Sequence, residues 1–168
     1  GNPYNMPYYQ AFFEEYGFQT YFNQHTYARE ISAGTMSEAV YARVKRLEEQ
    51  PEYRFEHIRM EDLDRVIEDF RSVYNKAWSM FTGVPQMDEV HARKLMNSLR
   101  PIIDPELVYF AYYNDEPIGF FIMIPDLNRI IGKFNGKFGL INKLRFIWDL
   151  KVAKKVDRAF GLIFGVTP

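Results

Sequence analysis

The fold is specified most clearly by residues 107–124, which read Leu107-Val108-Tyr109-Phe110-Ala111-Tyr112-Tyr113, then Asn114-Asp115-Glu116, then Pro117-Ile118-Gly119-Phe120-Phe121-Ile122-Met123-Ile124. Two runs of apolar and aromatic residues flank a short polar segment, and such runs favour extended backbone. Polar residues between two such runs favour a tight turn. The pattern therefore predicts a β-hairpin with residues 107–113 and 117–124 as its strands.

The residues that precede the hairpin predict one strand and two helices. Residues 53–59 alternate between apolar and polar side chains, which indicates a strand. Residues 61–79 carry apolar side chains at helical spacing, and the acidic residues of the first turn suit the positive end of a helix. A second helix is predicted over residues 88–99.

The last residues, 160–168, form an apolar run that predicts another strand. Because the run is apolar throughout, we expect a strand inside the sheet, followed by a loop and a helix. In many α/β enzymes the element after such a strand binds phosphate. The sequence therefore looks like a fragment that ends before such an element. A position of residues 160–168 at the edge of the sheet would count against the interpretation as an interior strand.

The first fifty residues predict smaller elements. A helix is expected over residues 7–17, because Pro7 suits the first position of a helix and Gly17 suits the position just after its end. The aromatic segment 18–27 favours a strand. Residues 1–34 thus form a helix-strand appendage, residues 35–52 a connecting amphipathic helix, and residues 53–168 the main domain.

Composition excludes several classes of site. The 168 residues contain no cysteine, which excludes disulfides, thiolate zinc sites and a cysteine nucleophile. The three histidines, His25, His57 and His91, do not have metal-binding spacing, so we expect no metal centre. No segment has the length of a membrane span or the pattern of a signal peptide, and we expect a cytoplasmic protein.

The charge is unevenly distributed along the chain. Residues 129–158 hold nine basic and two acidic residues, a balance of +7, whereas the whole chain has a net charge of −1. We expect a solvated helix face, with an anion-binding patch as the alternative. Within this segment, residues 140–155 predict a basic amphipathic helix. We expect a lid or core helix over the acceptor site, and a membrane-surface or partner-binding helix is the alternative.

The order of these elements resembles the opening of the GNAT superfamily of N-acyltransferases. The turn and glycine of the hairpin, residues 114–120, resemble that superfamily's second and third strands, and residues 165–168 resemble the end of its fourth strand. Residues 74–78 and 125–128 resemble a poorly characterised bacterial branch. The resemblance covers residues 53–168 and implies an α+β, or mixed α/β, fold with a mostly antiparallel sheet.

The resemblance also implies an activity, which is acyl transfer from acetyl-CoA or another acyl-CoA to an amine on a small molecule or peptide. Oxyanion stabilisation would come from the backbone of Gly165 and Val166. The acyl-CoA would contact Val166 and Pro168, and the acceptor pocket would contain Tyr74, Trp78, Asp126 and Asn128. Alternatively, the two aromatic residues pack on each other and the two polar residues only form a turn.

The sequence departs from the superfamily because it lacks the Gln/Arg-x-x-Gly-x-Gly/Ala loop that holds the pyrophosphate of acyl-CoA. We therefore expect a fragment that ends before this loop, binds acyl-CoA weakly and is inactive alone. Residues 1–34 would be the tail of a preceding acyltransferase-like unit. We expect no nucleic-acid or membrane partner, and a homodimer is allowed. The alternative function is a degenerate acyltransferase-like module retained for interaction.

Overall fold

The computed structural model describes residues 5–32, 34, 36–78 and 81–168. The chain divides into two units, residues 1–41 and residues 42–168. In the first unit, helix α1 (Tyr8–Glu15) forms as predicted and is followed by Gly17, whose φ is 101°. The strand predicted for residues 18–27 is wrong, because residues 18–32 form neither helix nor strand. Aromatic residues favour a strand only where a neighbouring strand is available for pairing. Helix α2 (Glu38–Glu48) crosses the boundary between the units.

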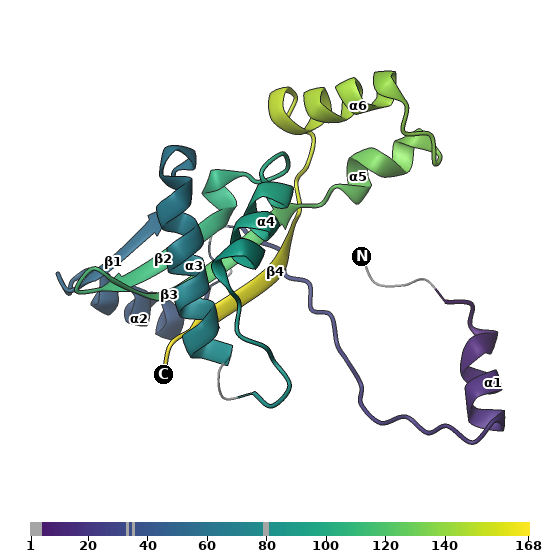
Figure 1. Cartoon of the computed structure of the whole chain (residues 1–168), viewed down its shortest axis with the longest axis horizontal. Helices are drawn as coiled ribbons and strands as arrows, with labels where there is room; N and C mark the ends of the chain where they lie inside the picture. The colour runs from purple at the N-terminus through teal and green to yellow at the C-terminus, as the bar shows by residue number, and fades with distance from the viewer. Residues whose placement is uncertain (1–4, 33, 35, 79–80) are drawn as a thin grey trace. The chain divides into compact units, whose positions relative to one another are not determined.

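The second unit is built on a four-stranded antiparallel sheet of order β1-β2-β3-β4 (Figure 1). The strands are β1 (Tyr53–His57), β2 (Val108–Tyr113), β3 (Glu116–Pro125) and β4 (Ala159–Val166). The predicted hairpin is confirmed as β2 and β3. Asn114 and Asp115 connect these strands with φ of 48° and 65°, the backbone of a two-residue turn whose twist matches that of the strands.

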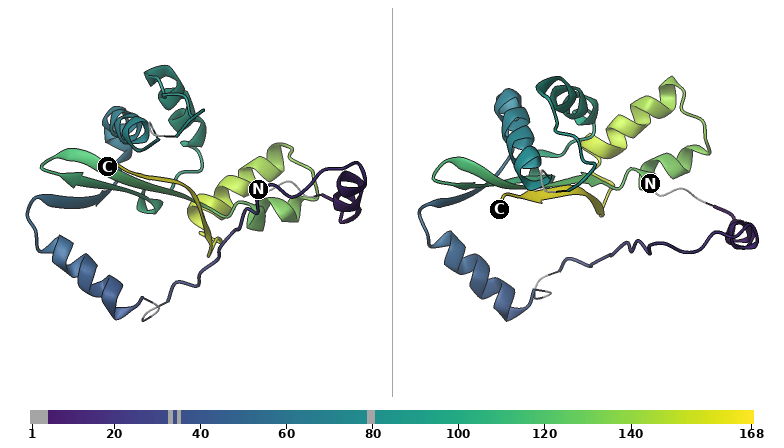
Figure 2. Two further views of the ribbon diagram at one scale, coloured as in Figure 1. Left: turned by 90° about the horizontal axis from the view of Figure 1, so that it is seen from below. Right: turned by 60° about the horizontal axis from the view of Figure 1, so that its bottom comes forward.

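Two long helices cover one face of this sheet, and Figure 2 shows them on the same side. They are α3 (Leu63–Trp78) and α4 (Glu89–Leu99), both close to the predicted bounds. Alternate residues of β2 and β3 point toward them, so in the main core Phe120 packs against Phe70 of α3 and against Phe110 of β2. This packing fixes the position of α3 on the sheet.

Strand β4 lies at the edge of the sheet, which corrects the prediction of an interior strand. Among the described residues it pairs only with β3. Most of its large side chains are 44–67% exposed, as for Phe160, Leu162, Phe164 and Val166. An apolar run identifies a strand but does not give the number of its neighbours. The position of β4 therefore gives the acyltransferase interpretation no support of its own.

Residues 126–158 form an insertion between β3 and β4. It contains helices α5 (Asn128–Ile131) and α6 (Leu140–Ile147) and a π-helical turn, Trp148–Val152. Ile130, Phe134 and Leu150 form a small second core within it, and Phe146 packs against this core. The remaining apolar side chains of α6 are exposed, so of the predicted lid or core helix the core helix is wrong, and the lid stays a prediction. No helix among the described residues has the length and apolar content of a membrane span.

Candidate functional site

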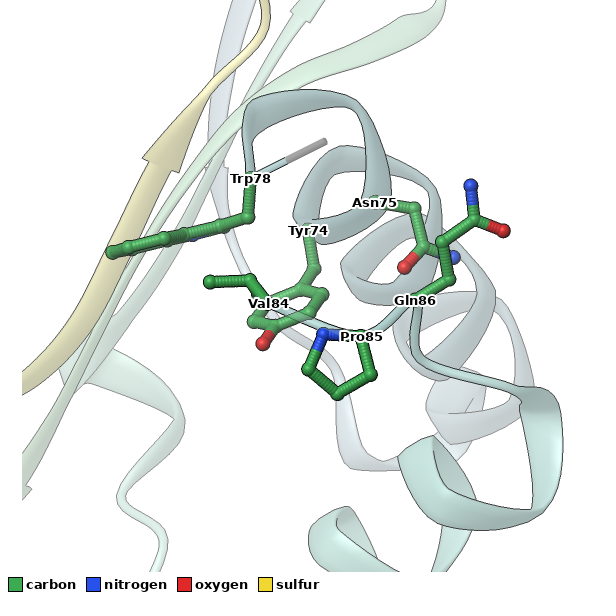
Figure 3. Close-up of a pocket in the computed structure, with 6 residues that line it drawn as sticks. All are labelled: Tyr74, Asn75, Trp78, Val84, Pro85 and Gln86. Atoms are coloured by element: carbon green, nitrogen blue, oxygen red, sulfur yellow. The ribbon is translucent and has the colours of Figure 1, made fainter. Parts of the chain in front are cut away.

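The last turn of α3 and the loop after it form a small recess. Tyr74, Asn75, Trp78, Val84, Pro85 and Gln86 line it, and its volume is about 10 Å³, the space of roughly one water molecule (Figure 3). The rings of Tyr74 and Trp78 are stacked with centroids 6.2 Å apart. Both residues were predicted for the acceptor pocket, and the structure places them side by side.

Asn75 holds the loop against the helix. Its side-chain nitrogen donates a hydrogen bond to the Met87 carbonyl at 2.9 Å, and its oxygen accepts one from the Met87 N–H at 2.7 Å. An amide side chain can satisfy both backbone groups of one residue in this way. The sequence pattern did not identify Asn75 as a positioning residue, although it lies within the quoted segment 74–78.

Trp78 carries a buried polar atom with no partner. Among the described residues, its indole Nε1 is the buried side-chain nitrogen or oxygen that makes no hydrogen bond. Leaving a buried donor unsatisfied costs about 1–3 kcal/mol. In Figure 3 the indole extends from α3 toward β4. A group placed to accept this hydrogen bond would remove that cost.

Gly165 allows β4 to approach the end of α3. A Cβ atom at this position would lie 3.0 and 3.1 Å from carbons of the Phe120 ring and 3.4 Å from the Ala77 Cβ. Carbon atoms normally pack at about 3.5–4.0 Å. The absence of a side chain at Gly165 therefore brings the backbone of β4 beside Ala77, the neighbour of Trp78.

The two residues predicted to stabilise an oxyanion, Gly165 and Val166, have backbone N–H groups that face opposite sides of β4. Thr167 donates its N–H to the Ile118 carbonyl of β3 at 2.8 Å. Because backbone groups alternate along an antiparallel strand, the N–H of Gly165 also faces β3. The N–H groups of Val166 and Phe164 then face the open edge. A ligand at this edge would be able to reach Val166, whereas Gly165 contributes close packing. Pro168 follows at the exposed end of the chain.

The structure does not bring Asp126 and Asn128 to this site. They follow the opposite end of β3, and the six residues from Phe120 to Asp126 span about 20 Å of extended strand. The Asp126 carboxylate accepts a hydrogen bond from the Asn128 N–H at 3.1 Å, and the Asp126 N–H donates to the Arg158 carbonyl. These contacts are those of a turn that begins the insertion, so the four predicted acceptor residues do not form one pocket.

A polar cluster that the sequence did not reveal connects the sheet to α3. The Tyr112 hydroxyl donates a 2.7 Å hydrogen bond to Asp69, and the Arg54 guanidinium lies 4.0 Å from the centre of the Tyr112 ring. Burial and the Asp69 carboxylate raise the pKa of Tyr112 above its usual range. The Arg54 guanidinium holds the pKa of Glu56 below its usual range. These contacts fix the helix that carries Tyr74 and Trp78.

The chemistry that the site itself can supply is limited. The six side chains that line the recess include no carboxylate and no imidazole. The part of the chain that the structure describes contains no group of three His, Cys, Asp or Glu residues placed to hold a metal ion. The site offers aromatic surface, one indole N–H and backbone N–H groups, which can orient a substrate and stabilise developing negative charge.

Residues 36–136 match the sequence family described as "Acetyltransferase (GNAT) domain", and this match covers more than half of the chain. "Bacterial ceramide synthase" from Caulobacter vibrioides is 31% identical over 107 residues, which are 64% of this chain and 28% of that protein. "Protein YghO" from Escherichia coli is 23% identical over 154 residues, which are 90% of this chain and 38% of that protein. The chain thus spans about a third of the length of these relatives.

A crystal structure of a Pyrococcus horikoshii protein assigned as an acetyltransferase also aligns with the chain. The alignment has 20% sequence identity and a TM-score of 0.32, and it covers 45% of this chain and 23% of that one.

Proposed function

Because the chain belongs to the GNAT acetyltransferase family, we propose that it is part of an acyl-CoA-dependent N-acyltransferase and is weakly active or inactive alone. The family match over residues 36–136 carries this proposal. It includes β1, α3, α4 and the β2–β3 hairpin, which are the elements that position Tyr74 and Trp78. The match ends before β4, so the roles given to β4 below rest on its geometry.

In the proposed reaction, the nitrogen of an acceptor amine attacks the thioester carbonyl of an acyl-CoA. A C–N bond forms, the C–S bond breaks, and the thiolate of CoA leaves. The Val166 N–H at the open edge of β4 would donate to the carbonyl oxygen as negative charge develops there. Since the side chains that line the recess include no carboxylate and no imidazole, we propose that water takes the proton from the amine.

We propose that the acceptor lies on the aromatic surface of Tyr74 and Trp78. The unpaired indole N–H would donate to a hydroxyl or carbonyl oxygen of the acceptor. The Caulobacter relative is named for making ceramide, whose amide joins an acyl group to a long-chain amine. A long-chain amine is therefore the first acceptor to test, followed by shorter amines.

Acyl transfer is tested by incubating acyl-CoA of several chain lengths with a panel of amines and measuring the free thiol of CoA. The 168-residue chain and the complete gene product are compared. We expect amine-dependent thiol release by the gene product and weak or absent activity in the 168-residue chain. Thiol release that does not depend on any amine, or no release at all, would contradict the proposal.

The alternative of an interaction module also has an observation in its favour, which is the exposed apolar face of α6. Binding through α6 is compatible with either function. Cytoplasmic location, the absence of a nucleic-acid partner and the homodimer stay predictions.

A further inference from the structure

Helix α6 and the turn after it present an apolar face to solvent. Five large apolar side chains on this segment are between 56% and 82% exposed: Leu140, Ile141, Leu144, Ile147 and Trp148. Isolated exposed apolar residues are ordinary on protein surfaces, but a contiguous group indicates a binding surface. We call these five residues the α6 face.

The α6 face is continuous because of helical spacing. At about 100° per residue, its five side chains fall within an arc of roughly 120°. Lys143 lies at one margin of the arc and Arg145 at the other. The opposite side of the helix carries Phe146, which packs against the second core, and the buried residues Asp149 and Leu150 follow on the same side. The insertion therefore uses one side of this segment for folding and leaves the other side uncovered.

The insertion that carries this face is strongly basic. Residues 129–158 carry a charge of +7. A hollow of about 380 Å³ in the same insertion is lined by Arg129, Lys133, Lys154, Lys155 and Asp157, which are four cations and one carboxylate. A positive insertion attracts a negative surface. Apolar side chains, a tryptophan and basic residues at the margins are the composition of helices that lie in the interface of a bilayer.

We propose that α6 docks this protein onto an anionic membrane surface. The α6 face would enter the boundary between headgroups and acyl chains, and the ammonium of Lys143 and guanidinium of Arg145 would remain beside the lipid phosphates. The two charges and the apolar side chains act together, as stable attachment at an interface usually needs both contributions. This proposal does not depend on acyl transfer, and it changes the sequence-based expectation that membranes are not partners.

The experiment is co-sedimentation of the 168-residue chain with vesicles. Vesicles of phosphatidylcholine alone are compared with vesicles enriched in phosphatidylglycerol, at low and high salt. We expect binding to the anionic vesicles, loss of that binding at high salt, and little binding to phosphatidylcholine. Inorganic phosphate at the same ionic strength should not compete, because a surface and not one phosphate group is recognised.

Variants test which residues make the contact. Leu144→Glu with Ile147→Glu should abolish binding, and Lys143→Gln with Arg145→Gln should lower the partition coefficient roughly 30-fold, since each basic residue contributes a factor of roughly five. Val90→Glu is the matched control, because Val90 is 75% exposed on α4. In a Trp78→Phe background, the fluorescence of Trp148 should shift to shorter wavelength with anionic vesicles.

Three results would overturn the proposal. The first is no binding to anionic vesicles by a folded chain, as judged by circular dichroism. The second is equal loss of binding in Val90→Glu and in the variant Leu144→Glu with Ile147→Glu. The third is a dimer in solution that this double variant converts to monomer, since the α6 face would then be an interface between copies of the chain. All three measurements are independent of enzymatic activity, so acyl transfer can fail while the membrane proposal stands.

Discussion

Replacing Gly165 with alanine should destabilise the domain, although the same change at Gly161 of the same strand should not. The new Cβ at Gly165 would lie 3.0 Å from the Phe120 ring, so that ring would have to retreat by about 0.5–1 Å to restore normal contact. Phe120 is 4% exposed and packs on Phe70, which is fully buried, with ring centroids 5.0 Å apart. The ring therefore has little room to move.

The expected cost follows from two opposing effects. Overpacking a core costs about 1–3 kcal/mol, whereas replacing glycine with alanine stabilises by about 0.4–1 kcal/mol through the unfolded chain. Gly165→Ala should therefore lower the free energy of unfolding by up to about 2.6 kcal/mol. At Gly161 the new Cβ would lie 3.4 Å from the ring of Phe121, which is 41% exposed and can shift. Gly161→Ala should be neutral or stabilising by up to about 1 kcal/mol.

Urea unfolding followed by far-ultraviolet circular dichroism measures both variants, and the transition midpoint of Gly165→Ala should be the lower one. Phe120→Leu provides a double-mutant cycle, because the smaller side chain should reduce the cost of Gly165→Ala. If Gly165→Ala is as stable as Gly161→Ala, or if the cycle shows no coupling, β4 does not pack on Phe120 and α3 as described.

Three further substitutions test the site and the insertion. Trp78→Phe removes the unpaired indole N–H, so it should leave stability unchanged or raise it by up to about 1–3 kcal/mol in urea titrations while weakening acceptor use in the thiol assay. Asn75→Ala removes both hydrogen bonds to Met87, and it should cost about 1–3 kcal/mol and speed amide exchange in that loop. Asp149 is held by Lys155 at 2.8 Å, which keeps the pKa of this carboxyl below its usual range. The pair with Lys155 stabilises the folded state fully above about pH 3.9, and this stabilisation is lost as the pH falls through the lower folded-state pKa of Asp149. Asp149→Asn should therefore be less stable than the parent chain at neutral pH, and its stability should change less with pH during acid denaturation.

Local patterns predicted most of the elements, because their physical causes are local. The helical spacing that predicts a helix over residues 61–79 gives α3, and two apolar runs around a polar turn give β2 and β3. The run 160–168 predicts a strand, and β4 forms there. Its neighbours depend on pairing across the sheet, which the run itself does not specify.

The candidate site was only partly predictable for the same reason. Tyr74 and Trp78 are four residues apart on one helix, so their contact follows from helical geometry. Asp126 and Asn128 were grouped with them, but the length of β3 separates the two pairs. The double hydrogen bond of Asn75 to Met87 joins residues twelve apart across a loop, and the contact of Gly165 with Phe120 depends on strand register. Neither has a local sequence signal.

The decisive measurement is acyl transfer by the complete gene product. With acyl-CoA and a long-chain amine, we expect free CoA thiol and the amide product to appear in equal amounts, the amide being identified by mass spectrometry. Trp78→Phe should reduce this rate. Thiol release without amide, or no thiol release with any amine from a folded protein, would show that the protein is not an acyl-CoA-dependent N-acyltransferase.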